Sequence, residues 1–149
     1  MDRRQDKYRL ELTNDVQQVP LLNTFVDAIC DEAGTTPALT MQLNLAIEEA
    51  VVNVMNYAYP KGTKGGILLT ARLSDDTLTF VISDKGIPFN PTLQKPADTT
   101  LSAEERQIGG LGIHLVRQLM DTVSYERRDD MNILTLSKFI KKEPKQISQ

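Results

Sequence analysis

Two pairs of strand-like segments, each pair joined by a short polar turn, constrain the fold of this chain more than any other sequence feature. Residues 67–73 and 78–84 flank the turn 74–77, and residues 122–128 and 133–139 form the second pair. Strands joined by such short turns pair in antiparallel fashion. The sequence therefore predicts two β-hairpins.

The other segments show helical patterns and one further strand. These predicted elements are a strand at 8–12 and helices at about 15–33, 37–59 and 111–120. Asn14 or Asp15 could cap the first helix, but Pro20 is the better marker of its first turn. Gly34 ends the first helix, and an irregular stretch with three prolines occupies residues 85–110. This mixture predicts a single α+β domain, a two-layer α/β sandwich with helices on one face of a mixed, mostly antiparallel sheet. Its core should span about 8–140, followed by a polar tail at 141–149.

Composition excludes several classes of protein. The chain has 149 residues, 40% of them apolar, and a net charge of −3. These values fit one globular domain and disfavour a nucleic-acid-binding surface. There is no apolar run of about 20 residues and no apolar signal core at the start, so we expect a cytoplasmic protein without a membrane partner. A single cysteine, Cys30, and a single histidine, His114, exclude a disulfide framework and a usual zinc site.

The second predicted helix carries a polar pair apart from its apolar stripe. Glu49 and Asn53 are four residues apart and therefore lie one turn apart on the same side of the helix. One interpretation is a solvated helix face. The other is a carboxylate and an amide that point into a cleft, where the amide oxygen could hold a magnesium ion and the carboxylate could act as a base.

Asp84 interrupts the apolar face of a predicted strand. It has the same parity as Leu78, Phe80 and Ile82, so its carboxylate should lie on the face that is otherwise apolar. Such burial costs several kcal/mol unless a partner satisfies the group. Gly86 follows and would let the backbone turn sharply or approach a ligand. The alternative is an ordinary strand-ending aspartate that begins a turn.

A glycine cluster opens the third predicted helix. Gly109, Gly110 and Gly112 lie where exposed backbone amides could hold a phosphate. The cluster is neither a Walker A loop nor a dinucleotide-binding fingerprint. It could equally be a flexible connector, and His114 within the helix fits a helix-face residue better than a catalyst.

Taken in order, these motifs resemble those of a known superfamily. Glu49-x-x-x-Asn53, Asp84-x-Gly86 and Gly110-x-Gly112 are similar to the motifs of the GHKL ATPases, which share the Bergerat ATP-binding fold of helices over a mixed sheet.

One branch of that superfamily is the most similar. The segments 45–53, 57–59 and 84–91 resemble the small anti-sigma-factor serine/threonine kinases, and the resemblance spans about 10–139.

The resemblance implies ATP and Mg²⁺ as ligands and assigns a role to each motif residue. Asn53 would ligate the magnesium ion, and Glu49 would be the general base on the substrate hydroxyl. Asp84 would accept a hydrogen bond from the adenine amino group, and Gly86 would let the loop pass close to the base.

The resemblance also assigns roles to the segment before the third helix. Gly110 and Gly112 would shape the phosphate seat, and residues 91–109 would form a lid over ATP. Arg106 would steady the γ-phosphate or contact the protein substrate.

The function implied is that of an ATP-dependent anti-sigma-factor kinase. Such a protein binds a sigma factor and phosphorylates an antagonist protein, and it could form a homodimer. One alternative is a partner-switching module that binds ATP without transferring phosphate. A less favoured alternative is a detached catalytic domain of a histidine kinase.

Overall fold

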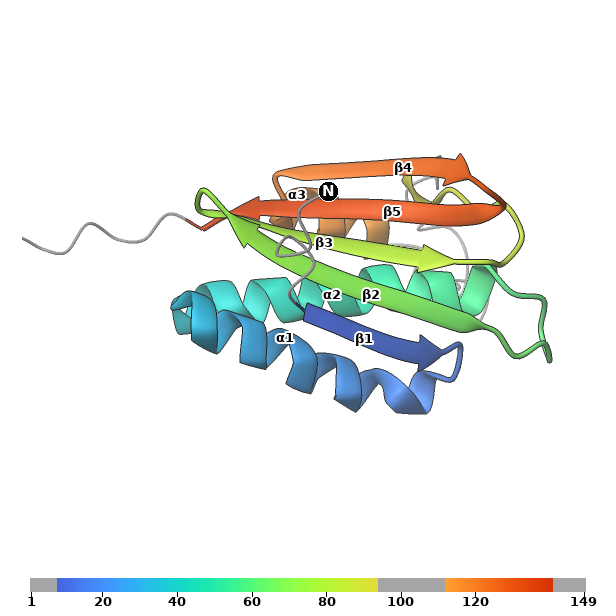
Figure 1. Ribbon diagram of the computed structural model, residues 1–149, viewed down its shortest axis with the longest axis horizontal. Helices are drawn as coiled ribbons and strands as arrows, with labels where there is room; N and C mark the ends of the chain where they lie inside the picture. The colour runs from blue at the N-terminus through green and yellow to red at the C-terminus, as the bar shows by residue number, and fades with distance from the viewer. Residues whose placement is uncertain (1–7, 94–111, 141–149) are drawn as a thin grey trace, which may run out of the picture.

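The computed structural model describes residues 8–93 and 112–140, which form a five-stranded sheet with three α-helices on one face (Figure 1). The strands are β1 (Tyr8–Thr13), β2 (Gly66–Ser74), β3 (Thr77–Asp84), β4 (Thr122–Arg128) and β5 (Met131–Phe139). Their order in the sheet is β1-β2-β3-β5-β4, and every neighbouring pair is antiparallel. The two-layer α+β architecture is as predicted, except that the described sheet contains no parallel pair.

Both predicted hairpins are present, and two-residue turns close them. Asp75 and Asp76 join β2 to β3, while Asp129 and Asp130 join β4 to β5. All four aspartates have φ between 52° and 62°. Two consecutive residues with positive φ give the turn whose twist matches that of the flanking strands, and aspartate tolerates this conformation better than most residues.

Local side-chain chemistry fixes where the first two helices begin. The helices are α1 (Val19–Ala33) and α2 (Pro37–Tyr57). Asp15 caps a separate short 3₁₀ turn, Val16–Gln18, and α1 begins after it with Pro20 in its first turn. The Thr36 hydroxyl accepts a hydrogen bond from the amide of Leu39 (3.1 Å) and caps α2.

Helix α2 ends two residues earlier than predicted because the residues after Tyr57 have other partners. The carbonyl of Ala58 accepts a hydrogen bond from the amide of Ile87 (2.7 Å). The Tyr59 hydroxyl donates to the carbonyl of Gly66 (2.5 Å) and accepts from the amide of Lys85 (3.2 Å). These bonds hold the end of α2 against the end of β3.

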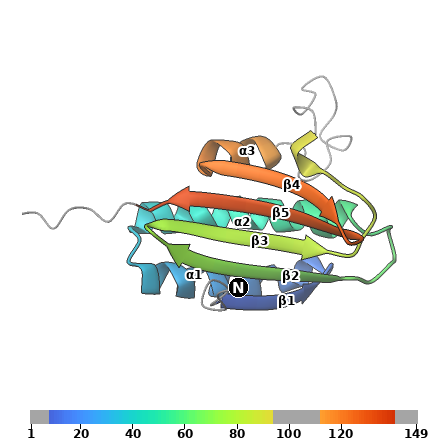
Figure 2. The same cartoon turned by 45° about the horizontal axis from the view of Figure 1, so that its top comes forward.

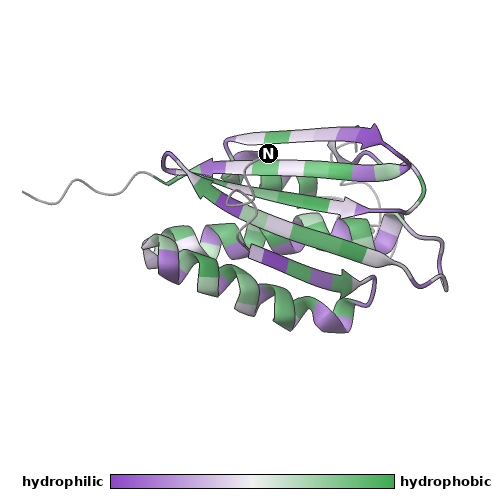
Figure 3. Ribbon diagram, in the orientation of Figure 1, coloured by the Kyte–Doolittle hydropathy of each residue, from purple (hydrophilic) through white to green (hydrophobic). Residues whose placement is uncertain are grey.

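The three helices lie side by side, with α2 between α1 and α3 (Gly112–Leu119), as Figure 2 shows. The core lies between the helices and the sheet. Its largest fully buried side chain is that of Phe80, at the centre of the sheet, where the residue is paired with Ala71 on β2 and Leu136 on β5. Figure 3 shows mixed hydropathy along the strands, with polar residues gathered at the end of β4. Within the described residues, no helix is long and apolar enough to cross a membrane.

Truncation of Phe80 tests whether this core carries the fold. Phe80→Ala should lower the free energy of unfolding by about 3–5 kcal/mol, because it leaves a cavity at the centre of the sheet. Leu73→Ala, at a side chain that is 43% exposed in the same hairpin, should cost much less. Urea denaturation of both variants measures the difference, and equal costs would contradict the assignment of the core.

Candidate functional site

The carboxylate of Asp84 is buried at the end of β3, on the helix-facing side of the sheet. The residue is only 3% exposed. Its Oδ1 accepts hydrogen bonds from the amide of Gly86 (2.8 Å) and from the Asn132 side chain (2.8 Å). Both bonds end at Oδ1, so Oδ2 is the atom that could accept a bond from a ligand. Burial raises the pKa of Asp84, while the two donors and the nearby Arg127 act to lower it.

Gly86 lies against the end of α2. A Cβ at this position would lie 2.0 Å from the carbonyl oxygen of Ala58 and 2.9 Å from Oδ1 of Asp84. Any side chain would therefore collide with the backbone. The backbone at Gly86 closely approaches the end of α2. This contact places the loop after Asp84 directly beside the helix.

Glu49 and Asn53 lie on the same helix, α2, further from this contact. At a rise of about 1.5 Å per residue, Asn53 is about 8 Å and Glu49 about 14 Å before Ala58 along the axis. The helix therefore presents these two side chains in a fixed order, starting from the loop that contains Gly86.

The Asn53 side chain is completely buried, and only the nitrogen of its amide has a hydrogen-bond partner among the described residues. Its Nδ2 donates to the carbonyl of Glu49 (2.9 Å). Its Oδ1 is buried and has no hydrogen-bond partner among the described residues. Leaving such an oxygen unpaired costs about 1–3 kcal/mol, so an ordered water, an ion or a ligand group is expected to satisfy it. An amide oxygen is also a ligand that Mg²⁺ accepts.

The carboxylate of Glu49 is partly buried. Burial raises its pKa, and the neighbouring Glu48 raises it further. Glu48 itself points toward α1, where it accepts a bond from Asn23 (3.4 Å). The two adjacent glutamates thus have different surroundings, and Glu49 is the one suited to accept a proton.

The sequence analysis missed the residue that organises the loop after β3. Asn132, at the start of β5, is paired with Asp84 in the sheet and is 4% exposed. It has the helix-facing parity of Leu134 and Leu136, so the argument used for Asp84 could have found it. Arg127, also missed, donates to the carbonyl of Gly86 (2.8 Å).

An aromatic contact also holds this loop. The rings of Tyr57, at the end of α2, and Phe89 lie 5.5 Å apart, centroid to centroid. Together with the bond from Ile87 to Ala58, this contact joins α2 to the loop at a second point.

The remaining predicted site residues lie at the border of the described chain or beyond it. Gly112 is the first residue of α3, as expected for a glycine at a helix start. Arg106, Gly110 and most of the proposed lid 91–109 lie outside the described residues. His114 lies in the first turn of α3, and its Nε2 is buried without a partner among the described residues. No three potential His, Cys, Asp or Glu ligands cluster in the part of the chain that the structure describes.

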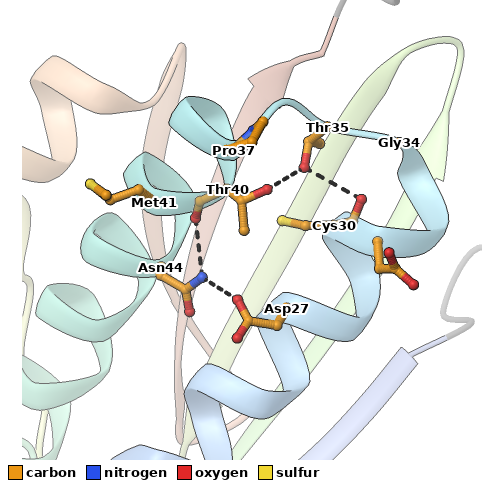
Figure 4. Close-up of a pocket in the computed structure, with 9 residues that line it drawn as sticks. Asp27, Cys30, Gly34, Thr35, Pro37, Thr40, Met41 and Asn44 are labelled. Atoms are coloured by element: carbon orange, nitrogen blue, oxygen red, sulfur yellow. Dashed lines mark hydrogen bonds between the residues drawn. The ribbon is translucent and has the colours of Figure 1, made fainter.

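A separate hollow of about 760 Å³ lies between α1 and α2 (Figure 4). Cys30 lines it, and Asn44 donates to Asp27 (2.7 Å) and to the carbonyl of Thr40 (3.1 Å) across its wall. None of the predicted site residues lines this hollow. The candidate site is therefore the other end of α2, with the loop that follows β3.

Comparisons with known proteins show the family and the fold of the chain. A family model of the histidine kinase-like ATPase domain matches residues 12–138. The chain is 34% identical over 99 residues to the serine/threonine-protein kinase BtrW of Bordetella bronchiseptica, covering 66% of this chain and 70% of that protein. It is 28% identical over 148 residues to the serine-protein kinase RsbW of Staphylococcus aureus, covering 96% and 92%.

A solved structure has the same fold. The structure of the RsbU and RsbW domains of a Mycobacterium tuberculosis protein superposes with a TM-score of 0.63 at 14% sequence identity. The match covers 91% of this chain and 33% of that one, so the present chain spans about a third of the solved protein.

The contact between Gly86 and α2 can be tested by adding one methyl group. Gly86→Ala should lower the free energy of unfolding by about 1–3 kcal/mol, because the new Cβ has no room beside the Ala58 carbonyl. Gly66→Ala is the matched control, since its Cβ would lie 4.0 Å from the nearest atom. Thermal or urea unfolding measures both, and a neutral Gly86→Ala would show that the loop is not packed against the helix.

Proposed function

Because the chain belongs to the histidine kinase-like ATPase domain family, we propose that it is an ATP-dependent serine/threonine protein kinase of the anti-sigma type. It binds a sigma factor and phosphorylates an antagonist protein, and the phosphorylation state of the antagonist decides whether the sigma factor is captured. Relatives named as serine or serine/threonine kinases support this assignment over the two alternatives, the non-catalytic switch and the detached histidine-kinase domain.

The observation that carries the proposal is the buried carboxylate of Asp84. Burying a charged group on an apolar face is costly unless it is paired. Two donors satisfy Oδ1, and the exocyclic amino group of adenine is a suitable donor for Oδ2. Asp84 is thus the base-recognition residue of the proposal, and Gly86 keeps the adjacent loop close enough to hold the base.

Asn53 fits a magnesium ligand. Its Oδ1 is buried, points away from the helix backbone contact made by Nδ2, and has no partner among the described residues. When bound, Mg²⁺ would neutralise charge on the ATP phosphates. The ion is the part of the proposal that rests on this single oxygen and on the family resemblance.

Glu49 is the proposed general base. The hydroxyl oxygen of the antagonist's serine or threonine attacks the γ-phosphorus, the bond from that phosphorus to the ADP oxygen breaks, and the hydroxyl proton passes to the Glu49 carboxylate. A raised pKa makes this carboxylate a better proton acceptor near neutral pH. The order Ala58, Asn53, Glu49 along α2 matches the order base, phosphates, acceptor hydroxyl.

Further parts of the proposal rest on the resemblance alone. Gly110 and Gly112 shape the phosphate seat, residues 91–109 close over ATP, and Arg106 steadies the γ-phosphate or contacts the antagonist. A cytoplasmic location and a homodimeric state belong to the same part of the proposal.

Replacing the proposed base tests the chemistry. Glu49→Gln should retain ATP binding but slow phosphoryl transfer by about 10²–10⁴-fold, because the amide cannot accept the hydroxyl proton. Glu48→Gln is the matched control and should slow the reaction far less, since Glu48 faces Asn23 on α1 and burial is the larger cause of the raised pKa of Glu49. Transfer of labelled phosphate from ATP to candidate antagonist proteins measures both rates. Equal turnover in Glu49→Gln removes Glu49 from this role.

Replacing the base-recognition residue should separate binding from stability. Asp84→Asn should weaken ATP binding by about 1.5–3 kcal/mol, the value of a hydrogen bond to a charged group. Calorimetric titration measures the loss, and Asp75→Asn, in the exposed turn of the same hairpin, is the control. Unchanged affinity in Asp84→Asn would refute the adenine role.

The same variant should not be less stable at neutral pH. The raised pKa of Asp84 means that its contribution to stability is full below the unfolded-state pKa and is lost as pH rises through the folded-state pKa. The substituted asparagine cannot ionise and could still accept both bonds through its side-chain oxygen. Wild type should therefore lose stability relative to Asp84→Asn as the pH rises above the unfolded-state pKa of about 4 and through the raised folded-state pKa, as measured by urea unfolding.

A further inference from the structure

We propose that Asn132 is a positioning residue that sets base selectivity. Its side chain donates a hydrogen bond to Oδ1 of Asp84 and so leaves Oδ2 to accept a hydrogen bond from the purine. This inference rests on the proposed function, since it assumes that Asp84 faces the base. It assigns to β5 a role that neither the sequence motifs nor the family resemblance assigned.

The Asn132 side chain uses its full hydrogen-bonding capacity. Its Nδ2 donates to Oδ1 of Asp84 (2.8 Å) and to the carbonyl of Ile87 (2.8 Å). Its Oδ1 accepts from the amide of Phe89 (3.1 Å) and from the Tyr125 hydroxyl (2.5 Å). An amide side chain offers two donor hydrogens and two acceptor lone pairs, and all four are used here.

These four bonds reach three separate parts of the fold. One holds the Asp84 side chain on β3, two hold the loop at Ile87 and Phe89, and one reaches Tyr125 on β4. Because Asn132 is 4% exposed, the bonds are sheltered from competing water. Asn132 therefore links the orientation of the carboxylate to the position of the loop.

The consequence for ligand choice follows from the chemistry of a carboxylate. With Oδ1 engaged by Asn132 and by the amide of Gly86, Oδ2 is the oxygen that meets the base. An ionised carboxylate only accepts hydrogen bonds. It therefore favours the amino group at position 6 of adenine and disfavours the carbonyl oxygen at the same position of guanine. Without Asn132, the carboxylate could rotate, and this discrimination should weaken.

The test compares ADP with GDP, which present the two base edges but have no γ-phosphoryl group to transfer. With the full chain and Mg²⁺, calorimetry should show that Asn132→Ala weakens ADP binding about tenfold, as expected for the loss of a hydrogen bond to a charged group. GDP binding should change little, so that the ADP-to-GDP affinity ratio falls by a similar factor.

Asn44→Ala is the matched control for loss of a hydrogen-bonded asparagine. Asn44 donates one bond to Asp27 on α1 and one to the carbonyl of Thr40 on its own helix, α2, remote from β5. The control variant should lower the unfolding temperature but leave both nucleotide affinities unchanged. If Asn132→Ala also leaves the ADP-to-GDP ratio unchanged, Asn132 is only a structural residue and the inference is wrong.

Asn132→Asp provides a readout that a structural role would not produce. It keeps both acceptor bonds but places a second carboxylate against Asp84, so the bond between them returns only when the two groups share a proton. ADP affinity of this variant should rise when the pH is lowered from about 7.5 to about 5.5. Wild-type affinity should fall or stay level over the same range, because Asp84 is a better acceptor when ionised. Parallel pH profiles for the two proteins would overturn the inference.

The proposed function and the role of Asn132 can be tested separately. If wild-type protein binds neither ADP nor GDP, the proposed function itself is wrong. If wild type binds ADP selectively and Asn132→Ala is folded, yet equally selective, only the assignment to Asn132 fails. Should Asn132→Ala not fold, the pH profile of Asn132→Asp decides the question.

Discussion

The burial of one carboxylate, that of Asp84, is the constraint around which this end of the molecule is arranged. A charged group on the inner face of a sheet is tolerated only when donors surround it. The Gly86 amide and the Asn132 side chain donate to the carboxylate, and the positive charge of Arg127, which donates to the Gly86 carbonyl, lies nearby. All three lie on or contact the loop after β3. Satisfying the carboxylate therefore shapes the loop as well.

This constraint reaches α2 through glycine. The loop can be close enough to Asp84 only if it also passes against the carbonyl of Ala58, and a Cβ at Gly86 would block that passage. The bond from Ile87 to Ala58 then fixes the loop to the helix. As a result, the end of α2 is held at a fixed place beside Asp84, and the spacing of Asn53 and Glu49 from that point follows from helix geometry.

Local patterns predicted the fold and the direction of one site residue, Asp84. The hairpins follow from turn length, and the inward direction of Asp84 follows from the two-residue period of a strand; both agree with the structure. The sequence could not predict that Asn132 lies opposite Asp84, because the register between β3 and β5 joins residues 48 apart. Likewise, the pattern placed Glu49 and Asn53 on one helix face, but only packing reveals that Oδ1 of Asn53 is buried without a partner among the described residues. The roles of these residues remain predictions.

The two buried asparagines of the site, Asn132 and Asn53, differ in how many of their hydrogen bonds are made. Asn132 has a partner for every donor and acceptor, whereas Oδ1 of Asn53 has none among the described residues. The first pattern is expected of a residue that holds other groups in place, because a fully bonded buried amide gains nothing from a ligand. The second is expected of a residue that binds, because the cost of an unpaired oxygen in the free protein is recovered when a ligand arrives. The hydrogen bonds in the structure thus distinguish the two buried asparagines, and sequence patterns alone do not show this difference.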